Sequence, residues 1–167
     1  KSLQVSLAAP TGRAANRLTE ATGFKASTIH RLLEADKNGF NRNEHAPLEA
    51  EILIVDESSM IDTNLMDKLL NAIQIGARLI LVGDVDQLPS VGPGMVLKDI
   101  IESRKVPVVR LERIFRQSEE SLITINAHRV RQGQLPYLKK NEIINYNEDF
   151  FFISKSDPMD ILNLIIT

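Results

Sequence analysis

Apolar runs alternate with amphipathic segments along most of this chain. Five apolar runs predict strands, and they cover residues 4–9, 51–56, 78–84, 106–112 and 149–154. Three of these runs are nearly continuous in apolar residues rather than alternating, which is typical of strands buried on both faces of a parallel sheet. The pattern therefore predicts an α/β fold built on a doubly wound, mainly parallel sheet.

Helical periodicity predicts four helices between and after these strands, over residues 12–23, 28–35, 63–74 and 119–132. Gly23 can stop the first helix, and Asp62 and Ser118 can cap the third and fourth. The positions of the third helix expected to share one apolar face are Leu65, Leu69, Leu70 and Ile73, before its stop at Gly76. Residues 36–47 are predicted to form a polar loop.

Polar clusters follow three of the predicted strands, at residues 9–13, 56–59 and 83–90. In doubly wound sheets, ligands bind at the carboxyl ends of the strands. A preference for turns would account for one such cluster but does not explain three. The sequence therefore predicts one binding site along this edge of the sheet.

Asp56 and Glu57 directly follow the apolar run 52–55. A carboxylate at a strand end can hold Mg²⁺, directly or through water, because this ion takes few carboxylates together with waters and substrate phosphates. Glu57 can then position and activate an attacking water. The alternative is a strand that ends in solvated acids.

Gln87 lies in the segment LVGDVDQLPSVGPG, in which Gly83 allows a sharp exit from the strand. The amide of Gln87 can both donate and accept a hydrogen bond, so it can sense a γ-phosphate and its attacking water. Asp84 and Asp86 fit a turn-rich loop, which is the alternative for the whole segment.

Thr11 and Arg13 stand at the predicted start of a helix, after the first strand. Their side chains and the backbone N–H groups of the helix can donate hydrogen bonds to a phosphate. Thr28, His30 and Arg31 could extend the same path, although a single histidine is more often structural or solvated, and His30 stays open on this ground. The alternative is that these arginines are merely solvated.

Composition excludes several classes of site. The 167 residues include no cysteine, which rules out disulfides, zinc–thiolate clusters and thiol nucleophiles and agrees with a reducing, cytoplasmic location. No apolar run is long enough to cross a bilayer, and the first ten residues lack the layout of a signal peptide. The formal net charge of -2 does not indicate nucleic-acid binding, but a local basic patch could still bind phosphates.

Five segments, in this order and spacing, resemble the motifs of the RecD-like, 5′-to-3′ superfamily 1 DNA helicases, the family of exodeoxyribonuclease V alpha subunits. APTGRAA, TIHRLL, ILIVDESSM, LVGDVDQLPSVGPG and RIFRQ are similar to motifs Ia, Ic, II, III and IV of that family. They extend from about Ala8 to Gln117, and five motifs in order are far more specific than one. The resemblance implies a RecA-like P-loop NTPase fold with helices on both faces of the sheet.

The resemblance also implies a role for individual residues. Asp56 would bind Mg²⁺, Glu57 would activate the catalytic water, Gln87 would couple the γ-phosphate of ATP to DNA, and Arg116 would contact that phosphate. The residues implied to line the path of single-stranded DNA are Pro10, Thr11, Arg13, Thr28 and His30. ATP and Mg²⁺ are the implied cofactors. Single-stranded DNA is the implied partner, possible further partners are other recombination or repair subunits, and no membrane or disulfide partner is expected.

The sequence departs from this family in one respect. It contains no G-x-x-x-x-G-K-[ST] motif, the Walker A loop, and no Gly-Lys dipeptide. The chain is therefore expected to be an incomplete piece of a larger motor. Residues 1–117 would form the first RecA-like motor domain without its Walker A segment, and residues 118–167 a connecting helix and the start of the second domain.

The parent protein is expected to be an ATP-dependent DNA helicase that translocates on single-stranded DNA and unwinds duplexes in recombination or repair. The piece by itself is expected to be inactive, because the phosphates would lack their main donors. The alternative is a non-catalytic nucleic-acid-binding or assembly module with the same fold.

Overall fold

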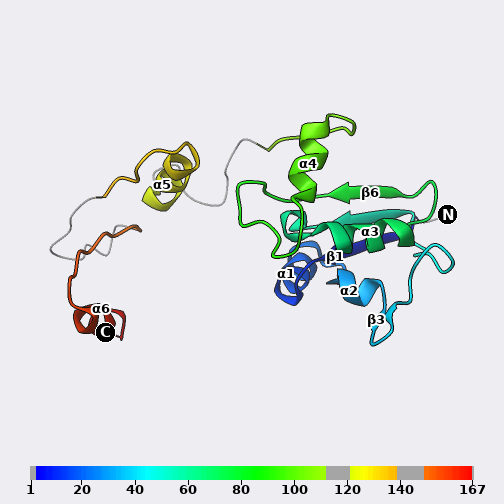
Figure 1. Cartoon of the computed structure of the whole chain (residues 1–167), viewed down its shortest axis with the longest axis horizontal. Helices are drawn as coiled ribbons and strands as arrows, with labels where there is room; N and C mark the ends of the chain where they lie inside the picture. The colour runs from blue at the N-terminus through cyan, green and yellow to red at the C-terminus, as the bar shows by residue number, and fades with distance from the viewer. Residues whose placement is uncertain (1–2, 112–120, 139–148, 167) are drawn as a thin grey trace. The chain divides into compact units, whose positions relative to one another are not determined.

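The computed structural model describes residues 3–111, 121–138 and 149–166 (Figure 1). The chain divides into two compact units, Lys1–Val109 and Arg110–Thr167, and each is described by itself. The first unit contains the sheet and all three polar clusters. The predicted domain boundary after residue 117 and the predicted phosphate contact Arg116 lie outside the described residues.

A four-stranded, fully parallel sheet forms the centre of the first unit, as predicted. In spatial order its strands are β2 (Ala26–Thr28), β1 (Val5–Ala9), β5 (Ile52–Val55) and β6 (Arg78–Leu81). The strands β1, β5 and β6 are confirmed within narrower bounds than predicted. The strand β2 was not predicted, because three residues are too few to give a periodic signal.

The helices described in the first unit are α1 (Gly12–Thr22), α2 (Ile29–Leu32), α3 (Thr63–Ala72), α4 (Val96–Ser103) and the 3₁₀ helix η1 (Ser58–Met60). The predicted polar loop contains a small antiparallel hairpin of β3 (Ala35–Asp36) and β4 (Gly39–Phe40). The connection from β1 to β2 crosses the sheet in the opposite direction from the connection between β5 and β6. Right-handed connections therefore place α1 and α3 on opposite faces, which is the predicted doubly wound arrangement.

The main core lies on the face of the sheet covered by α2 and α3. Its buried residues are Ala8, Ile29, Leu33, Leu48, Leu53, Val55, Ile61, Met66, Leu69 and Ala72. On the other face, Leu7 is buried, whereas Ile80 is 45% exposed. Apolar residues on both faces explain why the strands read as continuous rather than alternating runs.

Helix α3 begins at the predicted cap but ends earlier than predicted. The Asp62 carboxylate accepts a hydrogen bond from the Leu65 N–H at 2.7 Å. The helix stops at Ala72 rather than near Gly76, because the Ala72 carbonyl accepts the Leu48 N–H and the next residue bridges Leu48 in an extended conformation. Helix α1, in contrast, ends at the predicted stop, where Gly23 adopts φ 73°.

One residue predicted on the apolar face of α3 does not lie there. Leu70 is 53% exposed, whereas Met66 is buried. Successive helical residues are turned by about 100°, so Leu69 and Leu70 cannot both face the core squarely. Met66 lies three residues before Leu69 and takes the core position instead.

The described residues form no strand over 106–111 or 149–154, so two strand predictions are wrong there. Val109 is 86% exposed, and Phe152 makes only an isolated bridge. Apolar β-branched residues favour a strand only where a neighbouring strand and cover are available. Helix α4 and the terminal helix α6 (Pro158–Ile166) were not predicted.

The second unit contains α5 (Leu122–Arg131), which Ser121 caps by accepting the Thr124 N–H at 3.3 Å. The predicted cap, Ser118, lies outside the described residues. Asp149 accepts a hydrogen bond from the Leu122 N–H at 3.0 Å. Hydrogen bonds from the Ser121 side chain and from backbone N–H groups lower the pKa of Asp149.

Buried Asn126 of α5 holds the chain that follows the helix. Its amide donates to the Tyr137 carbonyl at 3.2 Å and accepts the Tyr137 N–H at 2.6 Å. The Arg129 guanidinium lies 3.8 Å from the centre of the Tyr137 ring. These contacts give the second unit a local structure of its own. In the part of the chain that the structure describes, no helix is long and apolar enough to span a membrane.

Candidate nucleotide and nucleic-acid site

Four parallel strands end at one edge of the sheet, and every predicted site residue that the structure describes follows one of them, except Thr28, which is the last residue of β2. The register pairs Ala9 with Thr28, Ala8 with Val55, and Val55 with Leu81. The chain leaves this edge at Pro10 after β1, at Asp56 after β5 and at Val82 after β6. The sheet thus brings the three polar clusters and Thr28 to a common edge.

Asp56 and Glu57 form a tight turn after β5. The Asp56 N–H donates to the Ala8 carbonyl of β1 at 2.9 Å, which fixes the end of the strand. The Glu57 N–H donates to the Asp56 carboxylate at 2.9 Å. Glu57 adopts φ 52° and ψ 36°, a left-handed conformation that costs free energy in a non-glycine residue. Such backbone strain is concentrated at functional sites, so it favours a chemical role for this acid.

The donor set at Asp56 fits Mg²⁺ held jointly with a substrate. Only one oxygen of the Asp56 carboxylate accepts a hydrogen bond from the described residues, and Asp56 as a residue is partly buried at the strand end. The described residues contain no group of three or more His, Cys, Asp or Glu side chains that could hold a metal ion. A site with one carboxylate suits Mg²⁺, whose remaining ligands are waters and phosphate oxygens.

The loop that carries Gln87 is fixed to the acid turn at its start. Buried Ser58 donates two hydrogen bonds to the Val82 carbonyl, from its N–H at 2.9 Å and from its hydroxyl at 2.8 Å. A Cβ atom on Gly83 would lie 2.9 Å from the Ser58 hydroxyl and from the Leu97 side chain. Glycine is therefore favoured here by close approach. The φ angle of Gly83 is not positive, so the exit of the chain from the strand does not itself require glycine.

The same loop is fixed to α3 at its end. The Thr63 N–H donates to the Pro93 carbonyl at 2.9 Å. A Cβ atom on Gly92 would collide with the Asp62 carboxylate, and one on Gly94 would collide with the Thr63 hydroxyl. These contacts were not found from the sequence, although the two closely spaced glycines in VGPG were a possible signal.

Gln87 itself is exposed between these two anchored ends. Its side-chain amide donates to the Asp84 carboxylate at 3.2 Å, and its N–H donates to the Asp84 carbonyl at 3.3 Å. Asp84 also accepts the Asp86 N–H at 3.0 Å, so Asp84 organises the turn as predicted for a turn residue. The arrangement leaves the Gln87 side chain at the surface, where it could meet a ligand.

On the β2 and β1 side of the edge, two threonines cap helices. Thr11 accepts the Ala14 N–H at 3.2 Å at the start of α1, and Thr28 accepts the Arg31 N–H at 3.2 Å at the start of α2. Each hydroxyl still has a proton to donate. The geometry is therefore compatible with phosphate contacts, but it also gives both threonines a structural role.

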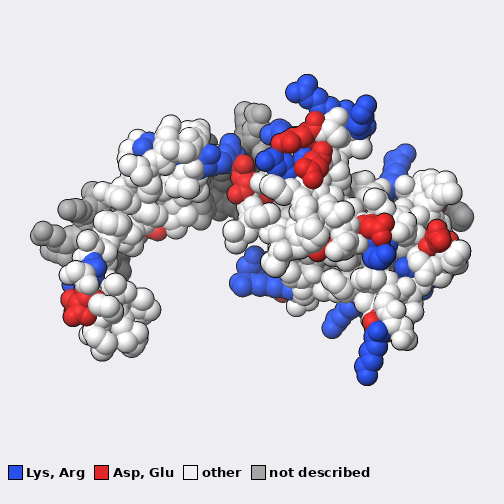
Figure 2. Space-filling model, in the orientation of Figure 1, with Lys and Arg blue, Asp and Glu red and all other residues white. Residues whose placement is uncertain are grey.

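The charged and aromatic candidates on this side are exposed. Arg13 lies in the first turn of α1, and His30 lies in α2 with its ring 5.7 Å from the ring of Phe40. On the face of the molecule in Figure 2, basic and acidic side chains are interspersed over the first unit. A phosphate contact here would depend on individual groups rather than on a broad positive field.

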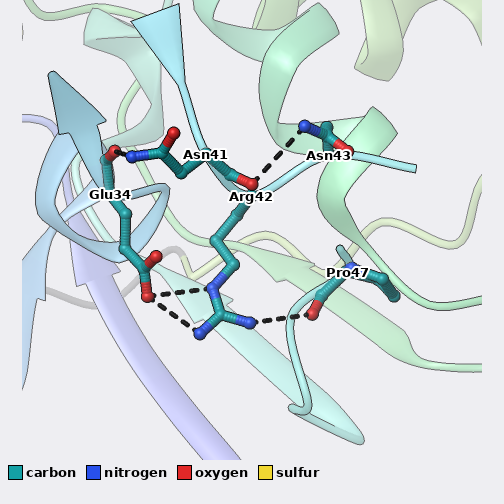
Figure 3. A network of polar contacts seen from close by, with 5 residues as sticks. All are labelled: Glu34, Asn41, Arg42, Asn43 and Pro47. Carbon is teal, nitrogen blue, oxygen red and sulfur yellow. Dashed lines mark hydrogen bonds and ion pairs between the residues drawn. The ribbon is translucent and has the colours of Figure 1, made fainter. Parts of the chain in front are cut away.

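A polar network supports the hairpin that carries Phe40 (Figure 3). The Arg42 guanidinium contacts one Glu34 carboxylate oxygen through two nitrogens, at 2.9 and 2.8 Å, and donates to the Pro47 carbonyl at 3.4 Å. The Asn41 amide donates to the Glu34 carbonyl at 3.0 Å. The loop predicted from composition alone is therefore held in a defined conformation.

The parallel sheet, with an acid pair after one central strand and an anchored polar loop after the next, is that of a P-loop type α/β domain. Residues 1–149 match the model of the AAA domain family, and the chain belongs to this family.

Curated relatives confirm the predicted resemblance to RecD-like helicases. The ATP-dependent RecD2 DNA helicase of Deinococcus radiodurans is 45% identical over 134 residues, which cover 80% of this chain and 18% of that protein. The RecBCD enzyme subunit RecD of Mycobacterium tuberculosis is 34% identical over an alignment of 186 residues, gaps included, which covers 98% of this chain and 32% of that subunit. The chain thus spans a third or less of these relatives.

A solved structure confirms the fold. The chain matches the crystal structure of Pif1 helicase from Bacteroides in complex with ADP-AlF3 and ssDNA with a TM-score of 0.57 and 24% identity. The match covers 81% of this chain and 38% of that one. The family match and this structural match therefore both confirm the α/β prediction.

Proposed function

We propose that this chain is part of an ATP-dependent DNA helicase that couples ATP hydrolysis to movement along single-stranded DNA, in recombination or repair. Residues 1–117 would belong to its first motor domain, and residues 118–167 to the connection and the start of the second. The observation that carries the proposal is the common edge, where the acid pair, the Gln87 loop and two helix starts meet. The relatives named above support it.

In this proposal, Asp56 would hold Mg²⁺ through its carboxylate, and the ion would neutralise charge on the phosphates of ATP. Glu57 would take the proton of the attacking water. Gln87 would hydrogen-bond to the γ-phosphate or to that water. Through this contact, ATP hydrolysis would depend on whether DNA is bound at the neighbouring part of the edge. Arg116 would add positive charge at the γ-phosphate.

Single-stranded DNA would pass the β2 and β1 side of the edge. Donors at Thr11, Arg13, Thr28 and His30 would contact its phosphates, with Pro10 beside them. Contacts to the backbone suit a motor, because such a protein must accept every base. We expect no ATP hydrolysis from the 167 residues alone, since they contain no glycine-rich loop with a lysine to bind the β- and γ-phosphates.

The test is the ATPase activity of the whole protein with and without single-stranded DNA. We expect strong stimulation by DNA, which Gln87→Ala would abolish while Gln74→Ala, an exposed glutamine after α3, would not. Stimulation that survives Gln87→Ala would contradict the assigned role of Gln87. Absence of any ATPase activity would instead favour a non-catalytic nucleic-acid-binding module with this fold.

A further inference from the structure

The imidazole of His30, a proposed DNA contact, lies against the ring of Phe40. The centres of the two rings are 5.7 Å apart, and their planes are inclined by 40°. In the part of the chain that the structure describes, the exposed His30 side chain makes no hydrogen bond and no ion pair. An exposed side chain without a polar partner can turn about its side-chain bonds, so the contact with Phe40 is what limits the orientation of the imidazole.

Phe40 offers His30 a fixed surface. It is the last residue of β4, it is partly buried, and its side chain packs against the main core of the first unit. Phe24, in contrast, is 73% exposed. A ring that rests on a close-packed core moves less than a ring in solvent, so Phe40 can restrain the imidazole beside it.

The segment that follows Phe40 is tied to the end of α2, the helix that carries the imidazole (Figure 3). The Glu34 carbonyl accepts the Asn41 side-chain amide at 3.0 Å, and the Glu34 carboxylate contacts the Arg42 guanidinium at 2.9 and 2.8 Å. The Leu33 carbonyl accepts the Arg42 N–H at 3.1 Å. Because Asn41 and Arg42 directly follow Phe40, these contacts fix the position of Phe40 relative to α2.

Glu34 occupies a backbone position that favours glycine. Its φ is 53°, a left-handed conformation that costs free energy in a residue with a Cβ atom. The ion pair with Arg42 joins side chains that are 51% and 33% exposed, and pairs of this kind contribute little to stability. A strained residue whose contacts add little stability is typical of a functional segment, so we look for the use of Glu34 in the hairpin that it holds.

From these contacts we propose that Phe40 is a positioning residue for His30. The Phe40 ring holds the imidazole in the orientation in which it meets a DNA phosphate, and the Glu34–Arg42 pair holds Phe40 in place. The inference rests on the proposed function, in which His30 contacts single-stranded DNA. An imidazole that is ordered before DNA arrives loses less conformational entropy on binding, and the contact is tighter for that reason.

The first arm of the test measures the mobility of the imidazole and needs no DNA. In the whole protein labelled with ¹³C in its histidine rings, the His30 signal is identified by its loss in His30→Gln. We expect relaxation measurements to show a more mobile His30 ring in Phe40→Leu, which keeps an apolar side chain without a ring, and normal mobility in Phe40→Tyr. Phe24→Leu is the matched control and should change nothing. Unchanged mobility in Phe40→Leu would overturn the proposal.

Glu34→Gly separates the support of Phe40 from the stability of the fold. Glycine removes the carboxylate but suits the left-handed backbone, so we expect little change in the Tm together with a more mobile His30 ring. Asp67→Asn, which removes an exposed ion pair with Lys68 on α3, is the control and should leave the ring unaffected. A His30 ring that keeps its mobility in Glu34→Gly would overturn the role of the Glu34–Arg42 pair.

The last arm measures the affinity of the whole protein for a labelled single-stranded oligonucleotide by fluorescence anisotropy. We expect Phe40→Leu to weaken binding by about two- to tenfold, the range expected when one more side chain must be ordered on binding, and Phe40→Tyr to recover most of it. In a His30→Gln background, Phe40→Leu should have no further effect, because both substitutions remove the same contact.

Effects of Phe40→Leu and His30→Gln that multiply would show that Phe40 does not act through His30 and would overturn the proposal. If the unsubstituted protein binds no single-stranded DNA, the proposed function and the DNA contact of His30 both fail. The mobility of the His30 ring then still decides whether Phe40 holds the imidazole.

Discussion

The two halves of the carboxyl edge are built by different means. On the β2 and β1 half, Thr11 and Thr28 cap helices within three residues of themselves. On the β5 and β6 half, Glu57 has a left-handed backbone, and the Gln87 loop is fixed by contacts from Ser58 and Thr63. The first half depends on local hydrogen bonds, and the second depends on contacts between segments far apart in the chain.

Function and stability can therefore be separated on one half of the edge but not on the other. On the first half, a threonine that could contact DNA also stabilises its helix, so its replacement changes both properties. On the second half, the strained Glu57 and the exposed Gln87 contribute little that the fold needs. Substitutions there should change chemistry more than stability.

The largest effect is expected for Glu57→Gln in the whole protein. Loss of a general base should lower the ATPase kcat by about 10²–10⁴-fold, while binding of single-stranded DNA should change little, because the proposed DNA contacts lie on the other half of the edge. Glu49→Gln, at an exposed glutamate before β5, is the matched control and should keep activity. ATPase assays and fluorescence anisotropy with labelled DNA measure both quantities. A parallel loss of DNA affinity would show that the two halves of the edge do not act separately.

Gly92→Ala tests the anchoring of the Gln87 loop. The new methyl group would collide with the Asp62 carboxylate, which caps α3, so we expect a loss of about 1–3 kcal/mol in the free energy of unfolding. Gly12→Ala is the control, because a Cβ atom at Gly12 would meet nothing within 4 Å. Urea denaturation of both variants gives the difference. Equal stabilities would mean that the loop is not held against α3.

Arg13→Ala tests the first half without disturbing a cap. Loss of one phosphate contact should weaken single-strand binding by several-fold and reduce the slope of log affinity against log salt by about one, with no change in Tm. Lys68→Ala, on α3, removes a charge of the same sign from another element. Titrations of the whole protein at several salt concentrations provide the measurement. An unchanged slope would remove Arg13 from the proposed DNA path.

The smallest effect is expected for the pKa of Asp36, in the hairpin of β3 and β4. The pKa of Asp36 is lowered from 3.8, first by the Asn38 N–H and then by the Asn41 side chain. Because the folded pKa lies below the unfolded one, the contribution to stability is present above the unfolded pKa and is lost as the pH falls through the folded pKa. An NMR titration should find the Asp36 carboxyl below 3.8, and Asn41→Ala should raise it. A midpoint at or above 3.8 would contradict the hydrogen bonding of the hairpin.

Features of the fold that depend on residues close to one another in the chain were predictable from the sequence. The cap at Asp62, the stop at Gly23 and the strands β1, β5 and β6 appear where the pattern indicates them. The runs at 106–111 and 149–154 carry the same apolar signal, yet no strand forms there in the described residues. A strand forms only beside a neighbouring strand, and the apolar run itself does not specify which strand that is.

Some features of the candidate site were likewise predictable from the sequence, and others were not. The residue types after each strand indicated acid, amide and phosphate-donor chemistry, because a preference for turns does not explain polar clusters after three strands. The sequence did not reveal that Gly92 and Gly94 must be small, or that Ser58 binds the Val82 carbonyl. Those facts depend on which backbone passes beside each residue.

The parallel α/β class, the Asp62 cap, the Gly23 stop and the types of polar group after each strand were all readable from the sequence, since each is encoded within a few residues. The strand order β2-β1-β5-β6, in contrast, was visible only in the folded structure, and it places the acid pair between the two threonine caps and the Gln87 loop. Long-range packing also determined that Ser58 reaches the Val82 carbonyl, 24 residues away. Long-range packing sets these neighbours, because a hydrogen bond between distant segments forms only when the whole sheet brings them together.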